Sequence, residues 1–299
     1  VDQLCLDAEK AVDQGKNYII LSDRGINKET APIPSLMAVS AVHHYLIEKR
    51  KRMQIDLVVE SAEPREVMHF ALLFGYGASI INPYMSFAII DRLVKNKAIQ
   101  LDYQKAEENY IKAINKGLLK ILSKMGISTL RSYRSAQVFE AVGINNDVIQ
   151  KYFEGTVSRI GGLGMREIAR EAMMAHAEAY RTDLRNKILL NTGTYHFRIN
   201  GEKHAWNPET IILLQNAVRN NDYLKYKEFS QRVTGENQSP LFLRGFFRLK
   251  KNPIPLDKVE PVENIFKRFV TGAMSYGSIS KEAHETIAIA MNRIGGRSN

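Results

Sequence analysis

The run from Ala273 to Gly277 reads Ala-Met-Ser-Tyr-Gly and approximates the small-x-Ser-x-Gly turn, which exposes a nucleophilic serine between a strand and a helix. A hydrolase built this way needs an acid and then a histidine further along the chain. The short remainder after Gly277 holds a single histidine, His284. The order of the residues therefore argues against a serine hydrolase.

The glycines Gly161, Gly162 and Gly164 precede a predicted helix, and backbone amides at such a position can bind a phosphate group. Their spacing matches neither the dinucleotide-binding pattern nor the P-loop pattern. We therefore interpret this run as a tight structural turn. By the same reasoning, Gly75 and Gly77 terminate another predicted helix.

Three histidines on predicted helices, His43, His44 and His69, are candidate metal ligands. None forms a credible ligand set with its neighbours on the same helical face, so we predict no metal site. The single cysteine, Cys5, excludes disulfides and cysteine-ligated clusters within this chain. We interpret Cys5 as a small buried residue on a helix.

Polar residues follow three predicted strands, at the edge where α/β sheets bind ligands. They are Asp23 and Arg24 after the first strand, Glu60, Glu63 and Glu66 after the second, and Asn82 and Pro83 after the third. The glutamates could act as acid or base, but we favour capping of a helix that starts at Pro64. Sequence order places these side chains at one edge without showing that a ligand binds there.

The elements that would position these residues alternate between strand and helix in the first third of the chain. Short apolar runs predict strands at 17–22, 55–60 and 78–81, with helices at 34–50 and 64–74 between them. Such strands favour a parallel sheet covered on both faces. Further on, the patterns predict helices, one capped by Gly126, and two weaker elements, with a proline-rich connector at 251–257. The helices are 103–125, 165–180, 210–218, 222–233 and 281–294, and the third of these has Asn207 as its predicted N-cap with Pro208 at the first helical position.

The weaker elements are read as a strand at 127–130 and a short helix at 137–142, and the segment 266–270 as a strand. The predicted fold class is therefore α/β, with a mostly parallel sheet flanked by helices and a helical C-terminal half. Whether the sheet is open or resembles a degenerate barrel stays undecided at this point.

The net charge of +10 is spread along the chain, which argues against nucleic-acid binding. Its densest cluster, Lys49 to Arg52, lies at a predicted helix end, where cations favour the helix dipole and are expected to be solvated. No apolar run approaches the roughly 18 residues of a membrane span, and no signal peptide is recognisable. These features fit a cytoplasmic protein, and the two chain ends predict a piece of a longer polypeptide.

The stretches Ile20 to Arg24, Leu57 to Ser61 and Gly75 to Tyr84, with others further along the chain, resemble in order the central domain of the large, glutamine-dependent glutamate synthases. The most specific run, from Arg268 to Ser280 and on to Asn299, is similar to the opening of their flavin-binding barrel, although the family usually has phenylalanine where this chain has Tyr276. The other stretches are 31–36, 41–44, 124–129, 132–134, 137–141, 207–210 and 214–215.

The resemblance implies a parent oxidoreductase of glutamate biosynthesis, nitrogen metabolism and ammonia assimilation. An amidotransferase domain would release ammonia from glutamine, and a synthase domain would add it to 2-oxoglutarate with hydride from FMN. Electrons would arrive through a 3Fe–4S iron–sulfur cluster, from ferredoxin or from an NADPH-oxidising small subunit. Cys5 lies inside central-domain sequence, so the nucleophile role of the amidotransferase cysteine does not transfer to it.

The resemblance also implies a division into residues 1–252, the central domain, and residues 253–299, a linker with the first strand and helix of the FMN-binding (β/α)8 domain. No catalytic residue can be placed here. Ala273, Met274 and Ser275 would either contact FMN in the full-length enzyme or only help to close the barrel. This chain alone is expected to be inactive and to hold no FMN. The alternative is an independent α/β small-molecule-binding enzyme.

Overall fold

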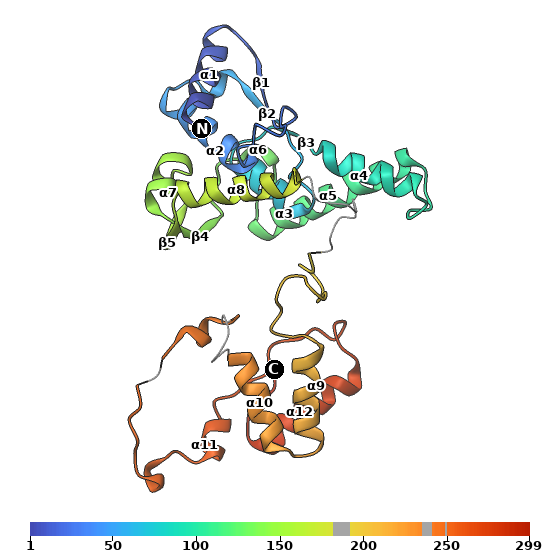
Figure 1. Cartoon of the computed structure of the whole chain (residues 1–299), viewed down its shortest axis with the longest axis vertical. Coiled ribbons are helices and arrows are strands. Elements are labelled where there is room, and N and C mark those ends of the chain that lie inside the picture. Colours follow the sequence, from blue (N-terminus) through green and yellow to red (C-terminus); the bar gives the residue numbers. More distant parts are fainter. Residues whose placement is uncertain (182–191, 235–240, 249) are drawn as a thin grey trace. The chain divides into compact units, whose positions relative to one another are not determined.

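A computed structural model describes residues 1–181, 192–234, 241–248 and 250–299 (Figure 1). The chain divides into two compact units, residues 1–187 and 188–299. The division falls inside a segment that lies outside the described residues.

The first unit is built on a parallel sheet of three strands in the order β1-β2-β3. The strands are β1 (Tyr18–Ser22), β2 (Asp56–Glu60) and β3 (Ile80–Asn82), linked by the helices α2 (Ser35–Glu48) and α3 (Val67–Gly75). The register aligns Ile20, Val58 and Ile80 in one row. The predicted strands, both helices and the parallel sheet are confirmed, and within the described residues the sheet is open.

The core lies between one face of this sheet and the helix α2. Leu57 and Val59 of β2 are fully buried, as are Val39 and Val42 of α2. All four belong to one apolar cluster, which also takes in Cys5 from α1 (Asp2–Asp13). The expected burial of Cys5 is thus confirmed. The helix α2 is apolar on most of its surface because it packs against both the sheet and α1.

The opposite face of the sheet is exposed, contrary to the prediction that both faces are covered. Tyr18, Ile20 and Ile80 keep 62%, 64% and 53% of their surface in solvent. The reason is topological. Both crossovers step in the same direction along the sheet, and right-handed crossovers of this kind put their helices on the same face.

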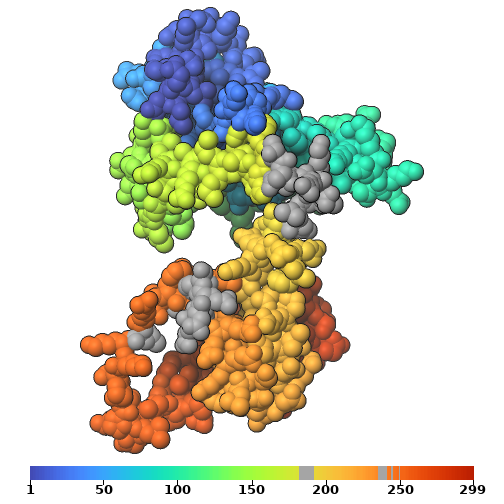
Figure 2. Space-filling model, in the orientation of Figure 1, coloured from blue at the N-terminus to red at the C-terminus, as the bar shows by residue number. Residues whose placement is uncertain are grey.

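A long helical pair extends the first unit beyond the sheet. The helices are α4 (Tyr84–Lys95) and α5 (Tyr103–Met125), and they project to one side in Figures 1 and 2. The N-terminus of α5 is capped by Asp102, whose side chain accepts from the Lys105 amide, and Gly126 ends the helix in the left-handed conformation. The predicted bounds of α5 and its glycine cap are confirmed, whereas α4 was not predicted.

Two predictions in the middle of the chain are wrong. The segment predicted as a short helix at 137–142 contains the start of strand β4 (Glu140–Ile144), which pairs in parallel with β5 (Val157–Leu163). The segment predicted as a strand at 127–130 leads into the short helix α6 (Leu130–Tyr133), because the Thr129 side chain caps its first turn. The pairing of β4 depends on a distant strand, which a local pattern does not reveal.

The glycine run predicted as a turn is mostly strand. Gly161 and Gly162 belong to β5, and Gly164 precedes α8 (Met165–Ala179). A Cβ on Gly162 would stand 2.5 Å from the Gly143 carbonyl oxygen, so glycine permits the close approach of β4 and β5. The Gly162 amide donates to Asn145 Oδ1 at 2.8 Å, so the strands and not a phosphate account for this run.

The helix α7 (Asn146–Tyr152) links β4 to β5 and closes the first unit against α2. In the second unit, α9 (Pro208–Arg219) packs on α10 (Tyr223–Thr234). The predicted cap of α9 is confirmed, since Asn207 Oδ1 accepts from the Glu209 and Thr210 amides at 3.0 and 3.1 Å. The described residues also contain short 3-10 turns at η1 (Arg52–Gln54), η2 (Leu243–Phe246) and η3 (Leu256–Lys258).

The strand predicted at 266–270 is not formed. Phe266 ends the helix α11 (Val262–Phe266), and only Val270 pairs, in an isolated parallel bridge with Arg297. A barrel strand needs a neighbouring strand along its length, and these residues find none within the described chain. The following helix α12 (Lys281–Ile294) is confirmed at its predicted bounds. Within the described residues, no helix is long and apolar enough to cross a membrane.

Candidate functional site at the carboxyl edge of the first sheet

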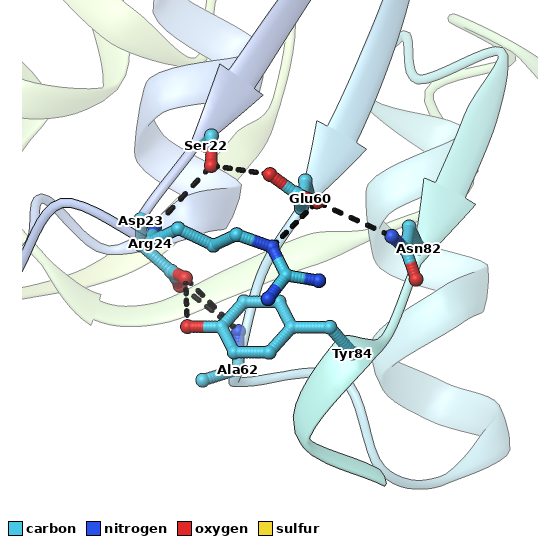
Figure 3. A network of polar contacts seen from close by, with 7 residues as sticks. All are labelled: Ser22, Asp23, Arg24, Glu60, Ala62, Asn82 and Tyr84. Atoms are coloured by element: carbon cyan, nitrogen blue, oxygen red, sulfur yellow. Dashed lines mark hydrogen bonds and ion pairs between the residues drawn. The ribbon is translucent and has the colours of Figure 1, made fainter. Parts of the chain in front are cut away.

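The carboxyl edge of the first sheet gathers the polar residues that the sequence placed after the strands. Ser22, Glu60 and Asn82 occupy one register row, at the last positions of β1, β2 and β3 (Figure 3). Asp23 and Arg24 follow β1, and Tyr84 begins α4. Parallel pairing brings together residues that lie 38 positions apart along the chain (Ser22 and Glu60) and 22 positions apart (Glu60 and Asn82), which is why they meet at one edge.

Glu60 is the centre of this network. Its carboxylate accepts from Ser22 Oγ at 2.6 Å, from Arg24 Nε at 2.7 Å and from Asn82 Nδ2 at 3.4 Å. The hydrogen bond from Ser22, followed by that from Arg24, holds the pKa of the Glu60 carboxyl below its ordinary value. Glu60 is therefore an ionised acceptor whose lone pairs are engaged, and it is poorly suited to act as a general acid.

Asp23 anchors the loop after β2. It accepts from Ser61 Oγ at 2.6 Å, from the Ala62 amide at 3.0 Å and from the Tyr84 hydroxyl at 2.7 Å. Partial burial, together with the hydrogen bond to Asp23, raises the pKa of Tyr84 to about 12. The phenol therefore stays protonated, and the Arg24 guanidinium lies 4.1 Å from the centre of its ring.

In these contacts, the polar side chains at the edge form hydrogen bonds with one another. One network joins the ends of β1 and β2 to the start of α4. A cavity of about 390 Å³ is lined by Ser22, Asp23 and Glu60 of this network, together with residues of the loop after β1. Chemically, the arrangement fixes three loops, because charge-assisted hydrogen bonds are stronger and more directional than neutral ones. Sequence order correctly predicted that Asp23, Arg24 and Asn82 lie at this edge. It missed Tyr84, although Tyr84 directly follows Pro83.

The remaining glutamates cap helices, with one correction. Glu66 precedes α3 and forms a capping box with His69, so α3 begins at Val67 and not at Pro64. The Glu63 carboxylate accepts from the Ser35 amide at 2.8 Å and therefore caps α2, which lies earlier in the chain. A capping contact across the fold leaves no local sequence signal.

The candidate histidines are distributed over separate contacts. His43 is buried, its Nδ1 accepts from Arg52 Nε at 2.8 Å, and its Nε2 lies 2.6 Å from Ser135 Oγ. His44 Nδ1 lies 2.8 Å from the Ser40 carbonyl oxygen. Within the described residues, no group of three histidine, cysteine, aspartate or glutamate side chains could hold a metal ion.

Arg52 departs from the prediction that the basic cluster 49–52 is solvated. Its guanidinium is buried and donates to His43 Nδ1, to the Ile55 carbonyl and to the Gly77 carbonyl. Its neighbour Lys51 instead pairs with Glu9 and Asp13 of α1, at 2.8 and 2.7 Å. No local sequence pattern distinguishes Arg52 from Lys51, since both residues follow the same helix end.

The residues implied as FMN contacts lie in the second unit. Ala273, Met274 and Ser275 form the loop between Val270 and α12, and Ser275 Oγ pairs with Ser278 Oγ. The backbone amides of these three residues have no hydrogen-bond partner within the described part of the chain. Their role toward a flavin stays a prediction.

The fold and the site together define a class: an α/β unit built on a small parallel sheet, with a network of hydrogen-bonded side chains at the carboxyl edge of that sheet. Residues 1–145 match the family described as glutamate synthase central domain, and residues 204–299 match the conserved region in glutamate synthase. The chain belongs to the glutamate synthase family, as its sequence motifs predicted.

Full-length relatives agree along nearly the whole chain. It is 49% identical to the large chain of the NADPH glutamate synthase of Bacillus subtilis, over 98% of this chain and 19% of the relative. It is 44% identical to the NADH glutamate synthase of Schizosaccharomyces pombe and 42% identical to the ferredoxin-dependent enzyme of Pyropia yezoensis, over 100% of this chain and 14% and 20% of those relatives. The chain thus spans about a fifth or less of the curated relatives it matches.

Proposed function

We propose that this chain connects the glutamine amidotransferase and FMN-synthase parts of a cytoplasmic glutamate synthase and holds them at a fixed separation. Residues 1–252 would form the central domain, and residues 253–299 the linker with the start of the synthase domain. The observation that carries this proposal is the closed polar network around Glu60, at the edge where α/β sheets otherwise bind ligands. The hydrogen bonds of this network hold the strand ends and loops of the edge in fixed positions, as a rigid connecting domain requires.

We infer that the parent enzyme makes glutamate from glutamine and 2-oxoglutarate with FMN and a 3Fe–4S cluster. Its electron donor would be NADPH, NADH or ferredoxin, the three that the names of the relatives print. Within this chain, the unpaired amides of Ala273 to Ser275 could donate to a flavin once the barrel is complete. The isolated chain should purify without flavin absorbance near 450 nm, because a single barrel strand cannot enclose the cofactor.

The connecting role can be tested in the full-length enzyme with the variant Glu60→Gln, which keeps the shape of the side chain and removes its charge. Glutamine hydrolysis and ammonia-dependent glutamate formation should each continue, because Glu60 would lie outside both active sites. Their coupling should weaken, so less glutamate should form per glutamine hydrolysed. The measurement is the ratio of the two products under steady turnover.

The matched control is Glu171→Gln on α8, which removes one exposed carboxylate outside the network. It should leave the product ratio unchanged. If Glu60→Gln instead lowered one half-reaction by roughly 100-fold or more while the enzyme stayed folded, Glu60 would be an acid–base catalyst and the connecting role would be wrong.

A further inference from the structure

One cavity of the first unit lies at the amino edge of the sheet, opposite the Glu60 network. It has a volume of about 920 Å³. Its wall includes the first residues of two strands, Tyr18 and Asp56, and the loops after α2 and α6. We call it the amino-edge cavity, and its charged lining consists of Arg50, Arg52, Arg131, Arg134 and Asp56.

The charges of this lining do not balance. Four guanidinium groups face a single carboxylate, Asp56, which accepts from Ser79 Oγ at 2.6 Å and lies 3.6 Å from Arg134. The C-terminal end of α2 adds about half a negative charge nearby. An excess of more than two positive charges therefore remains, because arginine does not lose its proton at physiological pH.

Arg52 is the fixed member of the group. It is only 8% exposed, and its recorded acceptors are neutral: His43 Nδ1 and the carbonyls of Ile55 and Gly77. Burial, followed by repulsion from Arg134, lowers the pKa of the Arg52 guanidinium. The Asp56 carboxylate attracts this guanidinium, but Asp56 accepts its hydrogen bond from Ser79. A buried cation that is not hydrogen-bonded to a counter-ion is costly, and an anion in the cavity would reduce that cost.

Two wall residues also hold an unusual backbone conformation. Arg50 and Ser135 have φ angles of 57° and 58°, in the left-handed region that a non-glycine residue enters at a cost of roughly 1–2 kcal/mol. At Arg50 this conformation ends α2, where the Arg50 amide donates to the Ile47 carbonyl and the Lys51 amide to the Leu46 carbonyl, both at 2.8 Å. Here, left-handed backbone at Arg50 turns the chain after α2 so that this residue joins the wall.

We propose that the amino-edge cavity binds a small anion that carries two or more negative charges on oxygen, either a phosphate group or a dicarboxylate. Arginine forks donate in pairs to both kinds of group, which is the chemistry the two share. Arg50 and Arg131 are exposed and have no ion-pair partner among the described residues, so they are available to contact it. Arg52 supplies fixed positive charge behind them. This site is independent of the connecting role.

The test titrates the full-length protein separately with inorganic phosphate and with malonate, at constant ionic strength set by chloride. Hydrogen exchange read by mass spectrometry on peptides covering 50–56 and 131–135 gives both the location and the dissociation constant. Protection should appear there with at least one anion. Arg131→Gln should weaken that binding by about tenfold, since it removes one charged contact.

Arg170→Gln is the matched control, because Arg170 is exposed on α8 and is not part of the cavity wall. It should bind as the unmodified protein does. Protection by phosphate alone, or by malonate alone, would decide which of the two anions the site takes. The proposal is overturned if neither anion protects these peptides up to about 10 mM, or if Arg131→Gln binds as tightly as Arg170→Gln.

Discussion

Replacing Gly77 by alanine should destabilise the first unit by roughly 4 kcal/mol. Gly77 has a φ angle of 113°, where a side chain is strained whatever space surrounds it, and its carbonyl accepts from Arg52 at 2.8 Å. An added Cβ would stand 2.3 Å from Nδ1 and 2.5 Å from Cγ of His43. Backbone strain and overpacking each cost about 1–3 kcal/mol, and the two add here.

The clash cannot relax cheaply, because the His43 ring is held from two sides. Arg52 Nε bonds one ring nitrogen at 2.8 Å and Ser135 Oγ the other at 2.6 Å, so a rotation of the ring would break buried hydrogen bonds. Native-state hydrogen exchange of the Leu57 and Val59 amides measures the loss, since both residues are buried in the core of this unit.

Gly126→Ala is the matched control. Gly126 also has a positive φ, 70°, but an added Cβ would have no atom within 4 Å. This variant should therefore lose only about 1 kcal/mol, from backbone strain alone. Equal losses in the two variants would show that the contact with His43 contributes nothing and that strain is the whole effect.

The sequence predicted best where a local pattern was sufficient. Leu57 and Val59 belong to a short apolar run that only a buried strand explains, and Gly126 ends α5 as its position indicated. Parallel pairing then placed Asp23, Arg24 and Asn82 at one edge, as expected. The strand and the helix end depend on residues close together in the chain, and the parallel order of the strands then determines which residues meet at the edge.

The sequence predicted poorly where distant segments decide the outcome. The strand β4 forms because β5 pairs with it, and Glu63 caps a helix that begins 28 residues earlier. Arg52 was grouped with Lys51 as a solvated cation, yet it is buried because the loop carrying Gly77 and the helix carrying His43 close over it. A run of charged residues in the sequence does not show which of them is buried, because burial is determined by tertiary packing.

The buried position of His43 also makes stability depend on pH. Burial, followed by the charges of Arg52, His44 and Arg134, lowers the pKa of His43 to about 3 from an ordinary value of 6.5. The native state thus resists a proton that the unfolded chain takes up near pH 6.5. The stabilisation is complete well above pH 6.5 and is lost as the pH falls from there toward 3.

Between pH 7.5 and pH 4.5 this linkage should remove roughly 2.5 kcal/mol of unfolding free energy, at 1.36 kcal/mol for each pH unit below the unfolded pKa. The window is informative because the carboxylates with lowered pKa, such as Glu60 and Asp56, lose most of their contribution below it, as the pH falls through and beyond their ordinary pKa values of 4.5 and 3.8. Urea unfolding at a series of pH values, followed through the core amides, gives the slope. It should be positive with pH throughout this window.

His43→Gln separates the titration from the packing, because a glutamine amide can still accept from Arg52 and donate to Ser135 without gaining a proton. The variant should be less stable at neutral pH but should lose most of the slope between pH 7.5 and 4.5. His69→Gln keeps a capping residue at the third position of α3 and should retain the full slope. If the slope persisted in His43→Gln, the pH dependence would come from other groups. His43 would then have to accept its proton in the folded unit, despite the neighbouring guanidinium groups of Arg52 and Arg134.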